Sequence, residues 1–205
     1  MSLAPTIIEK LARARGDLRM GVPVVLCAEG RAALVVAVEA LTAVRLADLR
    51  KLGTPELALT SWRAETLKAR AYDNDLARIA VPADEDADWL RALADPADDL
   101  RLPMKGPLRS LRDGPADLHR AAIALAKSAH LLPAALVLPV VNGAALATAH
   151  GLTVIPLEQA GPELARLSPL RVVAAARVPM VAVYRPLAGF AEAAGTLPST
   201  GRACT

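Results

Sequence analysis

The sequence predicts an α+β fold of three layers, in which a mixed, twisted β-sheet carries helices on both faces. Short apolar runs rich in Val, Leu and Ala alternate along the chain with segments in which apolar residues recur at helical spacing. Capping residues and glycines mark several boundaries between these segments. With 205 residues, of which 54% are hydrophobic, the chain can bury such a core.

The N-terminal segment is predicted to form a helix followed by two paired strands. Thr6 and Glu9 have the spacing of a capping box, in which a hydroxyl and a carboxylate satisfy free amides at a helix start. Gly21 ends this helix. The first strand, the turn and the returning strand follow over residues 22–26, 28–31 and 32–38.

Two more helix starts are marked in the next segment. Thr42 begins a helix that Gly53 ends, and Ser61 begins another. The predicted elements are, in order, a helix to residue 52, a strand over 56–60, a helix over 62–71 and a strand over 76–81.

An acidic segment over residues 84–99 contains seven Asp and Glu residues and one base, Arg91. Trp89, Leu90 and Leu93 form one apolar helical face, and acids before Trp89 favour a helix N-terminus. Three Asp at alternate positions from Asp84 resemble the start of a calcium loop, but the twelfth position holds Asp95 instead of the bidentate Glu. We therefore interpret the segment as a solvated helix.

The C-terminal half continues the alternation of helices and strands. The predicted elements are a Pro-broken crossing over 102–107, a strand over 108–111, a turn at 113–115, a helix over 116–130, a strand over 134–141, a helix over 143–150 with Gly151 as its left-handed cap, and a strand over 152–155. Beyond these we expect a helix over 157–167 interrupted at Pro162, and a strand within 172–184. We divide the chain into a domain over 1–160, an extension over 161–187 and a flexible tail over 188–205.

Composition excludes several classes of protein. A net charge of +3 without a block of five basic residues, and only two Trp, two Tyr and one Phe, make nucleic acid an unexpected partner. The longest apolar stretch, 131–141, contains two prolines and is far shorter than the roughly 20 residues of a membrane-spanning helix. Cys27 and Cys204 have no disulfide or metal-site spacing, and the N-terminus has no secretory signal, so we expect a cytoplasmic protein.

Common catalytic motifs are absent from the sequence. The first strand is not followed by a glycine-rich phosphate loop, and no zinc-protease or nucleophile-elbow motif occurs. His119 and His130 could share one face of the helix over 116–130, but no third ligand lies near them in sequence, and His130 and His150 are placed to favour helix C-termini. From the residues alone, no active site can be recognised.

Several stretches together resemble 3,4-dihydroxy-2-butanone-4-phosphate synthase. They are residues 91–96, 98–101, 107–109, and 121–135 with the apolar strand that follows to 142. The opening helix and strands, and residues 150–157, are also similar to that family, so the resemblance covers residues 5–160. It implies the fold of the family, an activity on ribulose 5-phosphate with release of formate, and Mg²⁺ as the metal.

The chain departs from the family at its functional positions. The long acidic loop of the first hairpin is reduced to residues 28–31, with Glu29 as its one carboxylate. Residues 84–89, four of which are acidic, stand where the resemblance places a phosphate-binding loop, and their charge would repel a phosphate. Arg101 is retained from an Arg-Pro-Gly-His element without its His, His119 is displaced by one position, and the late catalytic Glu falls at Pro139.

These departures lead to three hypotheses. The first is a non-catalytic synthase-like domain without cofactor, such as the degenerate N-terminal half of the larger GTP cyclohydrolase II, acting in homodimerisation or support of a cyclohydrolase domain. The second is a sugar-phosphate enzyme with a rearranged site formed by Glu29, His119, Arg101 and Arg109, for which Mg²⁺ would be the cofactor. The third is a nucleotide- or RNA-binding module, because a carbamoylating family has a related fold, although its basic signature is not evident.

The end of the chain bears on the first hypothesis. The larger cyclohydrolase form has a zinc-binding cysteine cluster near the start of its second domain, whereas this sequence offers only Cys204. We expect the chain to be a part of a longer protein, a truncated gene product, or a product whose reading frame shifts after about residue 178.

Overall fold

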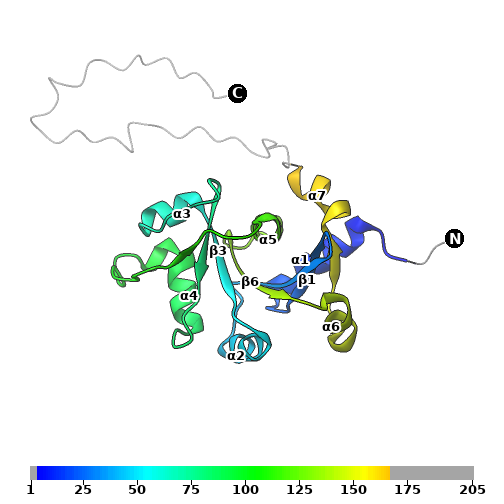
Figure 1. Ribbon diagram of the computed structural model, residues 1–205, viewed down its shortest axis with the longest axis horizontal. Helices are drawn as coiled ribbons and strands as arrows, with labels where there is room; N and C mark the ends of the chain where they lie inside the picture. The colour runs from blue at the N-terminus through cyan, green and yellow to red at the C-terminus, as the bar shows by residue number, and fades with distance from the viewer. Residues whose placement is uncertain (1–3, 167–205) are drawn as a thin grey trace, which may run out of the picture. The chain divides into compact units, whose positions relative to one another are not determined.

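One sheet organises the part of the chain that the structure, a computed structural model, describes, which is residues 4–166. Its strands lie in the order β5-β4-β3-β6-β2-β1-β7 (Figure 1). They are β1 (Val24–Ala28), β2 (Arg31–Ala37), β3 (Glu56–Thr60), β4 (Leu76–Ala80), β5 (Ser110–Leu111), β6 (Ala134–Val140) and β7 (Val154–Pro156). β1 and β7 are parallel and the other pairs antiparallel. The mixed sheet expected from the sequence is therefore confirmed.

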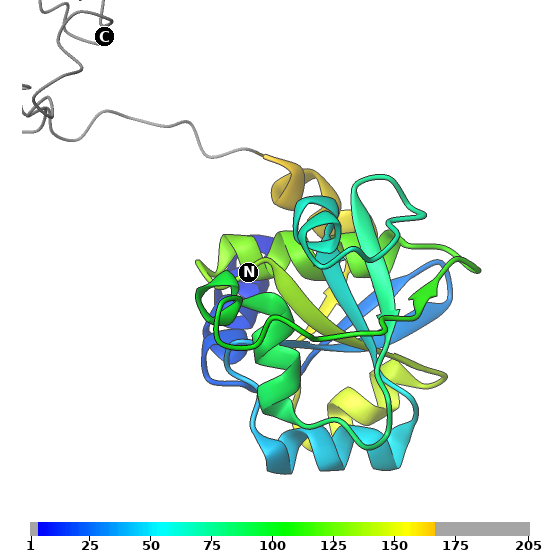
Figure 2. The ribbon, with the colours of Figure 1, turned by 90° about the vertical axis from the view of Figure 1, so that its left-hand side faces the viewer.

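Helices cover both faces of this sheet (Figures 1 and 2). One face packs against α1 (Ile7–Arg19), α5 (Asp117–Ser128) and α7 (Leu157–Ala165). The opposite face packs against α2 (Ala43–Leu52), α3 (Ser61–Thr66), α4 (Ala87–Ala94) and α6 (Gly143–His150). Together with the 3₁₀ helix η1 (Pro96–Asp98), these elements form the three-layer α+β fold that the sequence predicts.

Alternation along β2 shows how the two cores are divided. Val35 and Ala37 belong to the cluster beneath α1 and α5, while Leu34 and Val36 belong to the cluster on the other face. Successive side chains of a strand point to opposite faces, so a strand covered on both sides needs a continuous apolar run. This explains why the strands lack the polar alternation of a half-exposed sheet.

Most predicted helix boundaries are confirmed. The Thr6 hydroxyl accepts a hydrogen bond from the Glu9 amide at 3.3 Å, and the Glu9 carboxylate accepts one from the Thr6 amide at 2.7 Å. Thr42 caps α2 in the same way. Gly151 ends α6 with a left-handed φ of 63°, as expected for a residue without a Cβ.

Two helices end earlier than the sequence predicts. Thr60, not Ser61, caps α3, and the helix predicted to residue 71 stops at Thr66. Lys68 adopts a left-handed φ of 57° and its amide bonds to the Glu65 carbonyl, while the Ala69 amide returns to the Ala64 carbonyl. This is the Schellman motif, with Lys in the position that usually holds Gly.

The same motif ends α5 at Ser128. His130 has a φ of 59°, its amide bonds to the Lys127 carbonyl, and the Leu131 amide bonds to the Ala126 carbonyl. His130 therefore lies beyond the helix and cannot share a helical face with His119, which corrects the prediction from sequence.

The expectation of a break at Pro162 is also wrong. α7 runs through this proline to Ala165, although Pro162 cannot donate the usual backbone hydrogen bond. Ala160 is fully buried, and Leu157 and Leu164 pack against the core beneath α1 and α5, which holds the helix in place. The strand predicted within 172–184, the tail over 188–205 and most of the extension over 161–187 lie outside the described residues.

No helix in residues 4–166 is both long and apolar enough to cross a membrane.

The start of α6 lies so close to the sheet that only glycine fits there. A Cβ on Gly143 would lie 2.5 Å from the Ala32 Cβ and 3.0 Å from Val25 Cγ1. We expect Gly143→Ala to lower the free energy of unfolding by about 1–3 kcal/mol, because backbone or core must move. Gly16→Ala in α1 is the matched control: its Cβ meets nothing within 4 Å, and the change should stabilise the protein by about 0.5–1 kcal/mol. Urea denaturation measures both, and equal effects would contradict the close approach.

Candidate functional site

The four residues selected from the sequence lie in three regions. Glu29 is in the β1–β2 turn and His119 is in the first turn of α5, and Arg31 and Asp117 link these two elements. Arg101 follows η1 and lines a separate pocket of about 360 Å³ with Asp88 and Asp95. Arg109 is exposed beside β5, and its carbonyl accepts a hydrogen bond from the Ala80 amide. The structure thus brings Glu29 and His119 to the start of α5.

A bidentate ion pair joins the β1–β2 hairpin to α5. The Arg31 guanidinium donates to both carboxylate oxygens of Asp117, at 2.8 and 3.0 Å. These hydrogen bonds hold the pKa of Asp117 below its usual range. Glu29 approaches Arg31 at 3.6 Å from the exposed side, and its amide donates to the Glu158 carboxylate at 3.1 Å. Arg31 is therefore already occupied by the carboxylates of this chain.

His119 is paired with Glu56, the first residue of β3. Its Nε2 lies within hydrogen-bond distance of the Glu56 carboxylate, at 2.8 Å. The side chain is buried, and Nδ1 has neither a hydrogen-bond partner nor solvent access. A general base must reach the proton that it removes. The imidazole of His119 is therefore closed to a substrate, while the Glu56 side chain is partly exposed.

The sequence analysis did not select Arg31, Glu56 and Asp117. These residues form the ion pair and the histidine contact of this site. Each has a local signal: Arg31 directly follows the turn, Glu56 opens an apolar strand, and Asp117 is an acid in the first turn of a helix. Their partners are 86 and 63 residues away in the chain, so the pairing itself cannot be seen in the sequence.

The residues present do not fit a metal site. Among residues 4–166, no group of three or more His, Cys, Asp or Glu side chains could hold an ion. Two of the three Asp residues that resembled a calcium loop have other partners: Asp86 accepts the Trp89 amide at 2.8 Å and so caps α4, and Asp88 pairs with Arg91 at 2.6 Å. The described residues therefore offer Mg²⁺ no cluster of three or more such ligands.

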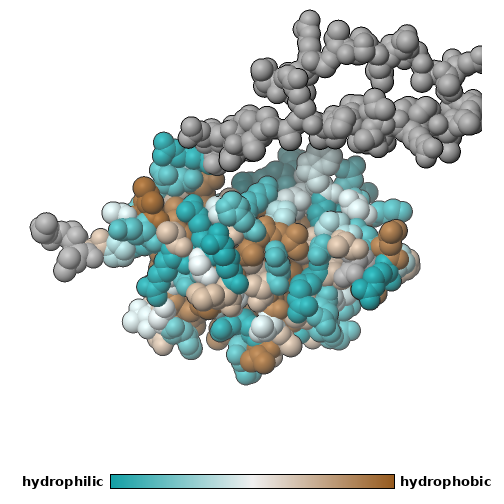
Figure 3. All heavy atoms as spheres, turned by 180° about the vertical axis from the view of Figure 1, so that it is seen from behind, coloured by the Kyte–Doolittle hydropathy of each residue, from teal (hydrophilic) through white to brown (hydrophobic). Residues whose placement is uncertain are grey.

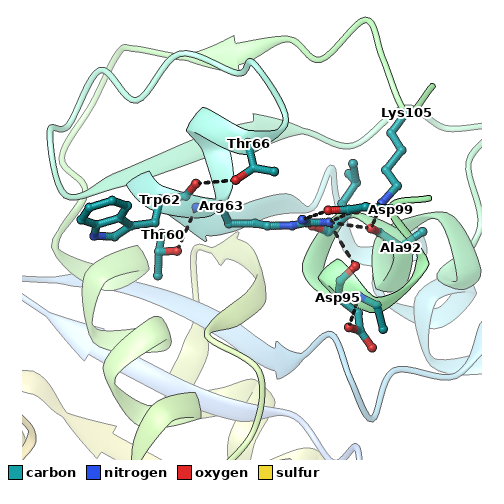
Figure 4. Close-up of polar contacts among 10 residues, drawn as sticks. Thr60, Trp62, Arg63, Thr66, Ala92, Asp95, Asp99 and Lys105 are labelled. Carbon is teal, nitrogen blue, oxygen red and sulfur yellow. Dashed lines mark hydrogen bonds and ion pairs between the residues drawn. The ribbon is translucent and has the colours of Figure 1, made fainter. Parts of the chain in front are cut away.

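A second charge cluster fixes the segment that follows α4 (Figure 4). Arg63 extends from α3 to the end of α4, whereas Trp62 points the other way. Its guanidinium donates to both Asp99 carboxylate oxygens, at 2.5 and 2.7 Å. It also donates to three backbone carbonyls near the end of α4, those of Ala92, Leu93 and Asp95.

Lys105 completes this cluster from the following loop. Its ammonium is buried, donates to the Ala92 carbonyl at 2.7 Å and also contacts the Asp99 carboxylate. The two cations satisfy carbonyls that a helix C-terminus leaves free. They also lower the pKa of Asp99 far below its usual range. Arg63, Asp99 and Lys105 thus form an internal cluster, the Asp99 clamp, in which both cations bind groups of the chain itself.

Comparison with known proteins places the fold. No family model matches the chain. GTP cyclohydrolase-2 from Azospirillum brasilense is 32% identical over 195 residues, which cover 88% of this chain and 51% of that protein. The chain thus spans about half the length of this relative.

Solved structures of 3,4-dihydroxy-2-butanone 4-phosphate synthase decide the question of fold. The cation-free form is 18% identical with a TM-score of 0.58, over 75% of this chain and 96% of that one. The chain has the synthase fold. The Candida albicans synthase gives 17% identity and a TM-score of 0.56, over 76% and 97% of the two chains. A two-domain synthase from A. baumannii gives 17% and 0.51, over 73% and 56%.

The Asp99 clamp predicts a dependence of stability on pH. Because the pKa of Asp99 is lower in the folded state, its contribution is complete above the unfolded value of about 4 and is lost as pH falls below it. We expect Asp99→Asn to lower the free energy of unfolding by about 2–3 kcal/mol at pH 7, since Arg63 and Lys105 would stay buried without a counter-charge.

The matched control for this prediction is Asp88→Asn. Asp88 pairs with Arg91 at the surface, so its loss should change stability by less than about 0.5 kcal/mol. Urea denaturation at pH 7 and pH 3 checks both variants. A cost of Asp99→Asn that is the same at the two pH values would contradict the role given to its charge.

Proposed function

We propose that this chain is a non-catalytic domain of the synthase fold that belongs to a GTP cyclohydrolase II-type protein of riboflavin biosynthesis. Its role is to dimerise and to support the cyclohydrolase, without a cofactor of its own, in the cytoplasm. The observation that carries the proposal is the closure of the candidate site: Arg31 is held by Asp117, and His119 is buried against Glu56.

The closed pairs matter because the reaction on a sugar phosphate needs groups that are free to bind it. A phosphate requires cationic side chains that are not already neutralised, and proton transfer requires a base within hydrogen-bond reach of the substrate. The Arg31–Asp117 pair and the buried Nδ1 of His119 meet neither need. The synthase-like framework is kept, while its polar groups bind one another.

Pro139 supports the same conclusion on β6. It lies opposite Ala33 of β2, at the position where the resemblance places the late catalytic Glu. A proline side chain can neither accept nor donate a proton. Together with the loss of the acidic loop around Glu29, this removes the carboxylates that such a site would need.

The proposed supporting role is in keeping with the surface. Several large apolar side chains are more than 60% exposed, namely Ile8, Met20, Val44, Trp62, Leu100, Met104 and Val141. On the face seen in Figure 3, hydrophobic residues lie in small groups among hydrophilic ones. Apolar side chains scattered in this way are common on protein surfaces, so the surface is compatible with the proposed contact and does not locate it.

Catalysis is tested with ribulose 5-phosphate and magnesium. We expect formate release no faster than in buffer with magnesium alone, because the site holds no free base or phosphate-binding cation, and an active synthase serves as the positive control. Formate at a normal enzymatic rate would refute the proposal. In that case the variant Glu29→Lys tests the hypothesis of a rearranged active site. Loss of formate release in this variant would place Glu29 in that site.

Dimerisation is tested by sedimentation velocity of the chain over a range of concentrations from about 1 to 100 µM. We expect a dimer over most of this range. A monomer at every concentration would remove dimerisation from the proposed role and leave only the support of a linked domain.

A further inference from the structure

A cleft of about 520 Å³ lies between α2 and α6, on the sheet face opposite to α5. Both ribbon views place these helices side by side (Figures 1 and 2). Leu34 of β2, Leu49 of α2, Leu146 of α6 and Leu152 line it. The candidate site at the start of α5 lies on the other face of the sheet, so this cleft is separate from it.

The cleft exists because α6 offers few large side chains. Its sequence is Gly-Ala-Ala-Leu-Ala-Thr-Ala-His, and Gly143 brings its start close against Ala32. Leu146 is the largest apolar side chain of this helix and points into the cleft wall. Leu46 and Leu49 anchor α2 in the core, and the space between the two helices remains open.

The rim of the cleft carries an excess of positive charge. It is formed by Arg45, Asp48, Lys51 and His150. Lys51 donates to Asp48 at 2.8 Å, and Lys51 and Arg45 both lower the pKa of Asp48. The Arg45 guanidinium makes no hydrogen bond or ion pair with any described residue. One carboxylate thus faces two permanent cations and an imidazole.

We propose that this cleft binds a small amphipathic anion from solution, with an apolar body against the leucines and a carboxylate beside Arg45. The volume falls within the roughly 300–1,000 Å³ of small-molecule sites, which are mostly apolar with a few polar groups that orient the ligand. An unpaired guanidinium at the rim of an apolar cleft favours an anionic head group over a neutral or cationic one.

Three ten-carbon probes of different charge test the proposal: decanoate, decanol and decyltrimethylammonium, each titrated into the full chain and followed by ¹H–¹⁵N NMR. We expect decanoate to shift the resonances of Leu49 and Leu146 and to bind about fivefold to tenfold more tightly than decanol, with decyltrimethylammonium the weakest. Equal affinities for the three probes, or shifts outside the cleft only, would overturn the proposal.

Variants separate the head-group contact from the apolar contact. Arg45→Gln should weaken decanoate about fivefold to tenfold and leave decanol unchanged. Lys10→Gln in α1, on the opposite face, is the control and should change neither. Leu52→Trp, at a half-exposed cleft residue that tolerates a larger side chain, should block both probes.

Two further outcomes would overturn the proposal. One is decanoate affinity unchanged in both Arg45→Gln and Leu52→Trp while the far-ultraviolet circular dichroism shows a folded chain. The other is a shift of the Leu49 and Leu146 resonances on dilution of the ligand-free chain, which would show that a second copy occupies the cleft.

Discussion

Pairing of β6 with both β2 and β3 joins two parts of the sheet that the chain builds separately. β1, β2 and β7 lie on one side of β6, and β3, β4 and β5 lie on the other. β6 begins at Ala134, about 100 residues after the strand it pairs with on one side. Its residues 134–138 are buried on both faces, so the hydrophobic burial that stabilises the protein depends on a strand that is synthesised late. The helices on each face, and hence both charge clusters, take their places from this sheet.

Among residues 4–166, the buried basic side chains Arg63, Arg78, Lys105 and His119 share one feature, which is that each contacts a carboxylate of the same chain. Arg78 donates to Asp73 at 2.9 Å and to the Asp113 carbonyl, Arg63 and Lys105 share Asp99, and His119 faces Glu56. An unpaired buried charge would be costly, whereas a paired one is tolerated. A catalytic site needs the reverse arrangement, with polar groups that wait for a ligand. Arg45, at the rim of the cleft between α2 and α6, has no such partner in the described part of the chain. It therefore has the arrangement expected of a side chain that binds a ligand.

The fold could be predicted from the sequence because it rests on local patterns. Apolar runs located β1, β2, β3, β4 and β6, and the capping box at Thr6 located α1. The helix ends at Lys68 and His130 were missed because a left-handed cap is readily recognised only when it is glycine. The candidate site was harder to predict, because the Arg31–Asp117 and Glu56–His119 contacts join elements that are distant in the sequence. Residue type at single positions gives no direct evidence of such contacts, and the resemblance pointed only to positions at which this sequence departs from the synthase family.

Two prolines limit how far the pairing of β3 with β6 can slip. The ladder runs from Leu59 opposite Ala134 to Glu56 opposite Val137, and Pro55 and Pro139 stand just beyond its end. A slip by two residues in one direction would draw Pro139 into the ladder, and a slip in the other would draw in Pro55. Proline has no amide hydrogen to donate to a ladder, so either slip is disfavoured. Pro139 thus also helps to set the register of the central strand, a role that does not depend on any reaction.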